Sequence, residues 1–248
     1  MMKLQRHQPI PSTDNSGFTI IESLIGIVIV AILLAFISPV LVLSTAIRVQ
    51  SKRIEKAAQV ANTFIDGVRT QSIPAPGKII SLTAASSTAA RTLSENLITL
   101  TTMPVPTQTS FSSNTNSDLY LFEKDGTICL VGSTGCATDT SSPFDEFYIQ
   151  AARIQVGTGA ATTNGYRLAM RIYRADVEVD KTILASSSSI KTVESPVTQS
   201  LGNKQAPLIE RTVDIASTAT TFNALCSRLG IAQKKDAGGT PQNQNCPQ

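Results

Sequence analysis

The pattern of apolar and polar positions divides the chain into an apolar stretch, a segment with helical periodicity and a longer part with alternating positions. From Phe18 to Leu43 almost every residue is apolar. As an α-helix rising about 1.5 Å per residue, this stretch is long enough to cross a hydrocarbon core of roughly 30 Å. It is longer than the apolar core of a cleaved secretory signal, which is typically about 7–15 residues. The pattern therefore predicts a membrane-spanning helix over residues 18–43.

Residues 44–72 continue this helix with a one-sided pattern. Apolar side chains recur every three or four residues, and charged side chains occupy the remaining faces. The apolar positions are Ile47, Ile54, Ala57, Ala58, Ala61, Ile65 and Val68. Because the stretch IPAPG at residues 73–77 cannot continue a helix, we expect the helix to end between Gly67 and Gln71. The pattern predicts an amphipathic extension that packs its apolar face against a sheet.

Residues 73–248 show the alternating pattern that is typical of strands. Residues 119–123 and 127–131 flank a KDG turn and predict a first hairpin. Residues 147–156 and 166–177 predict a second hairpin around a glycine-rich loop. A later strand is expected in RTVDIA and a short helix in FNALCSRLG. The expected fold class is α+β, with a long N-terminal helical spine packed on a C-terminal antiparallel sheet.

The second hairpin separates its side chains between two faces. Tyr166, Leu168, Met170 and Ile172 lie on one face, and Arg167, Arg171 and Tyr173 lie on the other. Antiparallel sheets commonly pack one face on a core and leave the other in water. We therefore expect the face with the two arginines to be solvated.

Glu22 is a single carboxylate inside the apolar stretch. A carboxylate in a membrane helix costs on the order of 3 kcal/mol on insertion scales, so its presence suggests a partner charge. If the chain is cut between Gly17 and Phe18, a new amine lies one helical turn from Glu22, in the same chain or in a neighbouring copy. The carboxylate would then set the register between subunits.

Four cysteines follow the apolar stretch: Cys129, Cys136, Cys226 and Cys246. An even number of cysteines in an exported domain favours disulfides over free buried thiols. Proximity favours pairing Cys129 with Cys136 and Cys226 with Cys246, although four cysteines allow three connectivities. A metal site is disfavoured, because no CxxC motif occurs and the only histidine is His7.

The composition supports neither an enzyme nor a nucleic-acid-binding protein. The net charge of +3 comes from scattered Lys and Arg, without a basic tract. There is no GxSxG elbow, no SxxK motif and no phosphate-binding or dinucleotide-binding glycine motif. We expect no catalytic residue, no cofactor and no metal.

The stretch GFTIIES followed by an apolar helix resembles the type IV prepilin signal, over roughly residues 16–70. The resemblance implies that a prepilin peptidase cuts after Gly17, that Phe18 is N-methylated and that Glu22 is the family's glutamate. It also implies partners: other pilin or pseudopilin subunits, an inner-membrane assembly platform and membrane lipid. In pilin-like proteins a proline at the position of Pro39 accompanies a stretch that loosens inside the fibre.

A proline also disrupts a helix for a local reason. Pro39 lacks a backbone donor and clashes with the preceding turn, so we expect a kink or local opening near residues 35–38. A passive kink in a membrane helix is an equally good interpretation.

The resemblance implies four segments. Residues 1–17 are the leader peptide, 18–43 the membrane and filament-core helix, 44–72 the amphipathic extension, and 73–248 the globular β-rich domain with serine-rich and threonine-rich loops. The implied location is the inner membrane, with a single span and a periplasmic C-terminal domain, and afterwards a pilus or pseudopilus.

Charge counting alone contradicts this orientation. Arg48, Lys52, Arg53 and Lys56 outnumber the basic residues before the helix, which would place the C-terminal domain in the cytoplasm. The prepilin resemblance and the four cysteines favour export, and we give them more weight.

The implied function is a structural pilin-like subunit of a type IV pilus or of a type II secretion-like pseudopilus. Residues 42–69 and 165–174 are also similar to cyanobacterial pseudopilins of the hormogonium polysaccharide secretion type. That similarity implies polysaccharide export and gliding motility. Two alternatives are an uncleaved single-span membrane protein with a periplasmic ligand-binding or partner-binding domain, and a secreted module released near Ala46.

Overall fold

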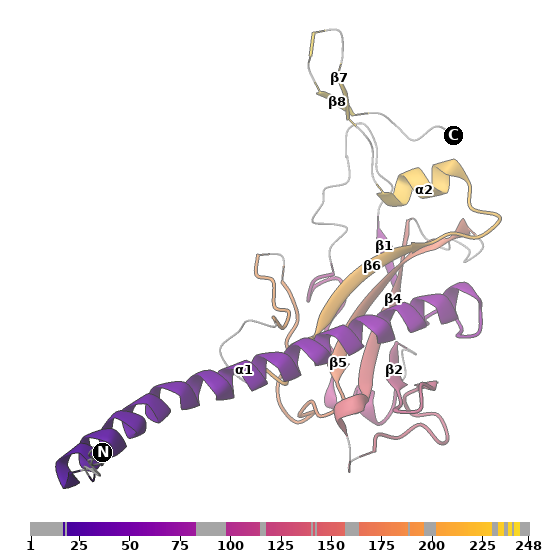
Figure 1. The fold of residues 1–248 in the computed structure, drawn as a ribbon. Helices are drawn as coiled ribbons and strands as arrows, with labels where there is room; N and C mark the ends of the chain where they lie inside the picture. The colour runs from indigo at the N-terminus through magenta and orange to yellow at the C-terminus, as the bar shows by residue number, and fades with distance from the viewer. Residues whose placement is uncertain are drawn as a thin grey trace, which may run out of the picture. The chain divides into compact units, whose positions relative to one another are not determined.

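A computed structural model describes residue 17 and residues 19–82, 98–114, 118–139, 141, 143–156, 164–187, 189–195, 202–229, 233–235, 238–239 and 241–243. The chain divides into two compact units, Met1–Thr45 and Ala46–Gln248. Helix α1 begins in the first unit and ends in the second (Figure 1).

Helix α1 spans Ile20–Arg69 and is continuous through Pro39. It ends where the sequence predicts, because the backbone turns at Gln71, which has a positive φ of 62°. The N–H of Ile73 then donates to the Gly67 carbonyl at 3.0 Å, which satisfies one of the last open acceptors of the helix. A Cβ on Gly67 would lie 2.5 Å from the end of the Ile73 side chain, so a larger residue there would displace that side chain.

The second unit is built on a six-stranded sheet with the order β3-β2-β4-β5-β6, and β1 beside β4. The strands are β1 (Ile79–Leu82), β2 (Leu119–Phe122), β3 (Ile128–Leu130), β4 (Phe147–Val156), β5 (Tyr166–Arg174) and β6 (Ile209–Ile215). All pairs are antiparallel except β1 with β4, which is parallel. The remaining elements are the 3₁₀ helices η2 (Gln108–Phe111) and η3 (Pro143–Asp145), helix α2 (Phe222–Leu229), and the strand pair β7 (Gln233–Lys235) and β8 (Pro241–Asn243).

Both predicted hairpins are present. In the first, Phe122 pairs with Ile128, and Gly126 takes the positive φ of 91° that the KDG turn requires. In the second, β4 and β5 pair from Phe147 opposite Arg174 to Ile154 opposite Arg167. The RTVDIA strand and the FNALCSRLG helix are confirmed as β6 and α2.

The main core lies between the second half of α1 and one face of the sheet. Helix residues such as Ala57, Ala61 and Phe64 are fully buried against Leu168 and Met170 of β5. The small alanines let the helix backbone approach the sheet, and Phe64 contacts the Tyr120 ring edge-on at 5.0 Å between centroids. The amphipathic pattern of residues 44–72 thus produces the packing that it predicts.

The opposite face of the sheet is not solvated, so that expectation is wrong. Arg171 and Tyr173 have no exposed surface. Residues 98–114 and 175–187 pack over this face and contribute Met103, Val177 and Ile183 to two further apolar clusters. The sequence pattern of the strands is that of a half-exposed sheet, but long connections cover its second side.

Candidate functional site: the exposed apolar half of helix α1

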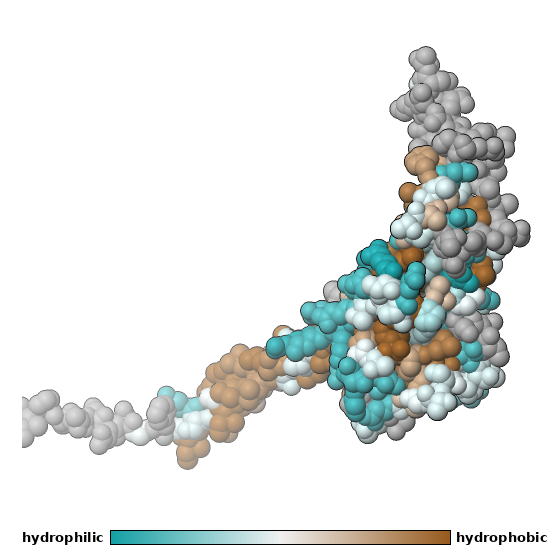
Figure 2. Space-filling view, turned by 90° about the vertical axis from the view of Figure 1, so that its right-hand side faces the viewer, coloured by the Kyte–Doolittle hydropathy of each residue, from teal (hydrophilic) through white to brown (hydrophobic). Residues whose placement is uncertain are grey.

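The first half of α1 presents apolar side chains to its surroundings on every face. The large apolar residues between Ile20 and Leu43 are 48–88% exposed, and Figure 2 shows this half of the helix as a continuous apolar surface. A helix that is apolar on all sides is stable only inside lipid or among other protein chains. By length and composition alone, α1 is long and apolar enough to cross a membrane.

The helix start is capped by Thr19. The Thr19 hydroxyl oxygen accepts a hydrogen bond from the backbone N–H of Glu22 at 3.3 Å, and the Thr19 carbonyl accepts one from the N–H of Ser23 at 3.1 Å. Thr19 therefore occupies the N-cap position and Glu22 the third helical position, the spacing of a capping box. Glu22 also places a negative charge in the first turn, where the helix dipole favours it.

Glu22 thus has two local reasons to occur at this position, the cap and the dipole. Neither requires a carboxylate surrounded by isoleucine and leucine side chains, because a cap operates equally well at the end of a water-exposed helix. The charge is informative because of its apolar surroundings.

The expected cleavage position lies immediately before this cap. Gly17 is exposed, and a Cβ built on it would meet no atom within 4 Å. Phe18 lies outside the described residues. The geometry leaves Gly17 accessible to an enzyme, while the helix begins only three residues later at Ile20.

Pro39 lies inside α1 without interrupting it. The helix is continuous through residues 35–38 and shows no local opening there, while a kink at Pro39 and loosening inside a fibre stay predictions.

Within the second unit, two contacts secure the part of α1 that follows the apolar half. Gln50 is 2% exposed and donates to the Glu194 carboxylate at 3.0 Å. The Arg53 guanidinium lies 5.2 Å from the centre of the Phe144 ring. Burial lowers the pKa of Arg53, and the nearby Arg174 charge lowers it further. Sequence reasoning missed these contacts, because the partners are far apart along the chain.

The first cysteine pair closes a short loop. Cys129 and Cys136 form a disulfide, the pairing favoured by proximity, with a Cα–Cα distance of 5.7 Å. Both half-cystines pack against the apolar cluster that includes Leu121 and Tyr173. The bridge fixes the segment after β3 onto the covered face of the sheet.

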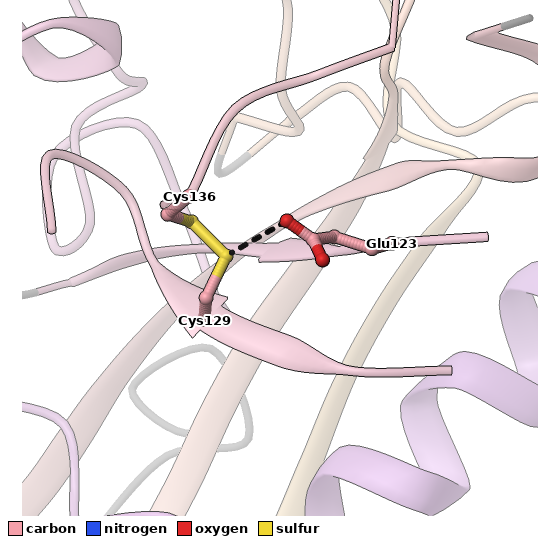
Figure 3. A group of neighbouring side chains, drawn as sticks. All are labelled: Glu123, Cys129 and Cys136. Atoms are coloured by element: carbon pink, nitrogen blue, oxygen red, sulfur yellow. Dashed lines mark hydrogen bonds between the residues drawn. A yellow bond between two sulfur atoms is a disulfide. The ribbon is translucent and has the colours of Figure 1, made fainter. Parts of the chain in front are cut away.

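Glu123 approaches this disulfide, with its Oε1 atom 3.6 Å from the Cys129 sulfur (Figure 3). The three side chains have the spacing of a metal-ligand group. A metal binds thiolates, and the two sulfurs are joined to each other, so the oxidised pair does not form such a site. The arrangement places a negative charge beside a disulfide.

The second cysteine pair is only partly described. Cys226, on α2, is disulfide-bonded. Cys246 lies outside the described residues, so the expected pairing of these two cysteines stays a prediction.

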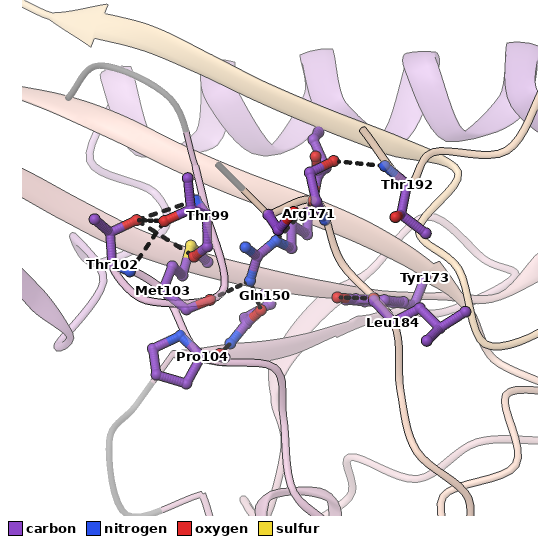
Figure 4. A network of polar contacts seen from close by, with 12 residues as sticks. Thr99, Thr102, Met103, Pro104, Gln150, Arg171, Tyr173, Leu184 and Thr192 are labelled. Atoms are coloured by element: carbon purple, nitrogen blue, oxygen red, sulfur yellow. Dashed lines mark hydrogen bonds and ion pairs between the residues drawn. The ribbon is translucent and has the colours of Figure 1, made fainter. Parts of the chain in front are cut away.

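A buried ion pair organises the covered face of the sheet. Arg171 on β5 has no exposed surface, and its Nε donates to the Glu210 carboxylate on β6 at 3.0 Å. Its Nη1 donates to the Met103 carbonyl and to the Gln150 side chain (Figure 4). Gln150 in turn donates to the Pro104 carbonyl at 2.7 Å. The network fixes the connection around residues 98–104 to the sheet.

A second connection is attached through the same carboxylate. The N–H of Ser186 donates to Glu210 Oε1 at 3.1 Å, and the Tyr173 hydroxyl donates to the Leu184 carbonyl at 3.1 Å. These groups hold two connections against the strands, and the buried Nη2 of Arg171 has no hydrogen-bond partner among the described residues. Their contacts are structural, and a network buried in this way is not accessible to a substrate.

Comparison with known proteins gives one match. Residues 13–38 match the family model described as the prokaryotic N-terminal methylation motif. No curated protein and no solved structure matches the chain.

The class of protein follows from the fold and this motif together. A long N-terminal helix followed by a mostly antiparallel six-stranded sheet is consistent with the type IV pilin fold. The motif at residues 13–38 adds the N-terminal signature and supports a type IV prepilin-like protein. It implies processing by a prepilin peptidase and assembly with other pilins, and the apolar helix indicates membrane association.

Proposed function

We propose that the chain is a structural pilin or pseudopilin subunit. It is held in the inner membrane by residues 18–43, with its C-terminal domain in the periplasm. It is cut between Gly17 and Phe18, methylated on Phe18 and passed by an assembly platform into a filament. The observation that supports this most is a helix with exposed apolar side chains on every face that directly follows a methylation motif.

Glu22 sets the register in this proposal. Moving an apolar helix from lipid into a bundle of helices gains little hydrophobic free energy, because both surroundings are apolar. Specificity must therefore come from packing and from polar groups. A carboxylate that costs about 3 kcal/mol in lipid loses that cost when it pairs with the amine of a neighbouring Phe18. Only one stagger of the helices allows this pairing.

The narrower proposal is a pseudopilus that serves polysaccharide export and gliding motility in a cyanobacterium. It rests on the similarity of residues 42–69 and 165–174 to pseudopilins of that type. A subunit of a type IV pilus is the other candidate within the same class.

Cleavage can be tested with the full-length chain carrying a C-terminal tag, expressed in its host with and without the prepilin peptidase. The proposal expects a loss of mass corresponding to residues 1–17 only when the peptidase is present. Gly17→Val should block the loss. Gly26→Val is the matched control, because a Cβ at Gly26 also meets no atom within 4 Å.

The alternatives give different results in the same experiment. An uncleaved single-span membrane protein keeps its full mass with or without the peptidase. A secreted module is cut near Ala46 independently of the peptidase and leaves the membrane. Either result contradicts the proposed function.

A further inference from the structure

The part of α1 that directly follows the apolar half exposes two basic side chains on one face of the helix. Arg48 and Lys52 are both exposed. They are four residues apart, a spacing that keeps two side chains on the same face. Gln50 and Ala57 lie on the opposite face and are buried in the second unit. We call Arg48 and Lys52 the basic pair.

Two further basic residues follow closely, and the structure separates them from the basic pair by their contacts. Arg53 lies over the aromatic ring of η3, and Lys56 forms an ion pair with the carboxylate of η3 at 2.5 Å. These two side chains hold η3 against the helix. Among the described residues, neither Arg48 nor Lys52 forms an ion pair or a hydrogen bond. Folding of the second unit therefore uses Arg53 and Lys56 and leaves the charges of the basic pair unused.

The charge of this part of the helix is one-sided. Residues 23–54 contain three basic residues and no acidic one. Glu55 is the first acidic residue after this stretch, and it forms no ion pair with Lys52 among the described residues. An exported domain puts this positive charge on the exported flank of the membrane helix, whereas Lys and Arg are usually in excess on the cytoplasmic flank. A negatively charged partner at the membrane surface accounts for cations at this position.

With residues 18–43 in the hydrocarbon core, the basic pair lies at the level of the lipid headgroups. Arg48 follows Leu43 by five residues and Lys52 by nine, which is about 7.5 Å and about 13.5 Å along a continuous helix. The headgroup layer on each side of the core is roughly 5–8 Å thick. Side chains lean toward the N-terminus of their helix, here toward the membrane, and the long stems of Arg and Lys extend their reach. Arg48 therefore lies within the headgroup layer, and Lys52 reaches toward its outer edge.

We propose that the basic pair binds the headgroups of anionic lipids at the periplasmic surface of the membrane. The proposal rests on the proposed function, because it requires residues 18–43 in the membrane and the C-terminal domain in the periplasm. Each cation near an anionic lipid surface strengthens binding about fivefold. Headgroups adjoin this part of the helix at all times before assembly, whereas an acidic segment of another protein has to be brought to it. The charge and the position of the pair therefore favour lipid.

The lipid preference of the full-length chain tests the proposal. The chain is purified in a neutral detergent and titrated with phosphatidylglycerol, which is anionic, or with phosphatidylcholine, which has no net charge, and native mass spectrometry counts the bound lipids. The wild type should prefer phosphatidylglycerol. The double variant Arg48→Gln/Lys52→Gln should lower this preference roughly 5- to 25-fold, because it removes both cations. Arg48→Lys/Lys52→Arg should retain the preference, because it keeps both charges.

Arg69→Gln is the matched control on the same helix. Arg69 is exposed, but it follows Arg48 by twenty-one residues, which is about 31 Å along the axis and far beyond a Debye length of about 8 Å. Its substitution should leave the lipid preference unchanged. Raising the ionic strength to about 1 M should reduce the preference of the wild type, because salt screens exposed charges.

Three results overturn the proposal and leave the proposed function standing. The first is equal binding of the two lipids by the wild type. The second is an unchanged preference in Arg48→Gln/Lys52→Gln, and if this variant also enters filaments of correctly cleaved subunits poorly, the basic pair contacts a protein neighbour instead. The third is loss of the preference in Arg48→Lys/Lys52→Arg, which removes charge as the cause. A chain that keeps residues 1–17 or is released near Ala46 contradicts the proposed function, whatever its lipid preference.

Discussion

The hydroxyl of Thr19 caps the backbone N–H of Glu22, 3.3 Å away, at the first turn of α1. The helix begins at Ile20, three residues after Gly17, and Glu22 in its first turn is the only carboxylate of the apolar half. The cap, the carboxylate and the expected cleavage position therefore lie close together at the N-terminal end of the helix. Cleavage would expose an amine within a helical turn of Glu22.

Two substitutions separate the capping role of Glu22 from the role of its charge. Glu22→Gln keeps the polar side chain of a capping box but removes the charge, whereas Glu22→Ala removes both. If the charge sets the register, both variants should insert and be cleaved, and both should lose filament incorporation to a similar extent. Filament yield relative to membrane-bound protein is the measurement. A Gln variant that assembles normally contradicts the register role.

The ion pair of Arg171 with Glu210 should be essential for the stability of the sheet domain. Arg171→Met leaves the Glu210 carboxylate buried without its cation, which typically costs about 3–5 kcal/mol. Thermal unfolding of the full-length chain in detergent should shift sharply downward. Arg211→Met is the control, because Arg211 is exposed and should change stability by less than about 0.5 kcal/mol. Equal effects of the two variants contradict the assigned role.

The four tyrosines should titrate abnormally. Burial raises the pKa of Tyr148, Tyr166 and Tyr173, and raises that of Tyr120 to about 12. A raised pKa in the folded state means that the unfolded state loses its tyrosine protons first, near pH 10. The stability contributed by neutral Tyr120 is present below pH 10 and is lost between about pH 10 and 12.

Phenolate absorbance measures this directly, since the chain has no tryptophan. The folded chain should show little phenolate at pH 10.5 and then a steep rise that coincides with unfolding. In denaturant, all four tyrosines should titrate near pH 10. Ordinary titration of several tyrosines in the folded chain contradicts the buried positions.

The charge of Glu123 should slow reduction of the Cys129–Cys136 disulfide. A thiolate that attacks the Cys129 sulfur brings negative charge to it, and a thiolate that attacks the Cys136 sulfur makes Cys129 the leaving thiolate. In both cases negative charge develops 3.6 Å from the Glu123 carboxylate. Glu123→Gln should therefore speed reduction by glutathione roughly three- to tenfold. Asp125→Asn, on the same turn, should have a much smaller effect. Unchanged reduction of the Gln variant rules out electrostatic protection.

Local patterns predicted much of the fold. The KDG turn and the alternating residues on either side of it predict a hairpin from residues that are close together in the sequence. The row of apolar residues that ends at Val68 predicts the buried face of α1. The pairing of Cys129 with Cys136 was also favoured locally, because only seven residues separate them.

What the sequence did not predict depends on contacts between distant segments. Arg171 looked like a solvated residue of a half-exposed sheet, yet Met103 and Glu210 enclose it from 68 and 39 residues away. The short strand β1 pairs in parallel with β4, and four apolar-rich residues carry too little pattern to indicate that. Gln50 and Glu194 meet across 144 residues.

The most direct test of the account is mass spectrometry of the N-terminal peptide of the protein isolated from membranes of its native host. The account predicts a peptide that begins at Phe18 and carries one additional methyl group. A peptide that retains residues 1–17 contradicts processing and indicates a plain membrane anchor. A chain that begins near Ile47 contradicts the retained apolar helix itself.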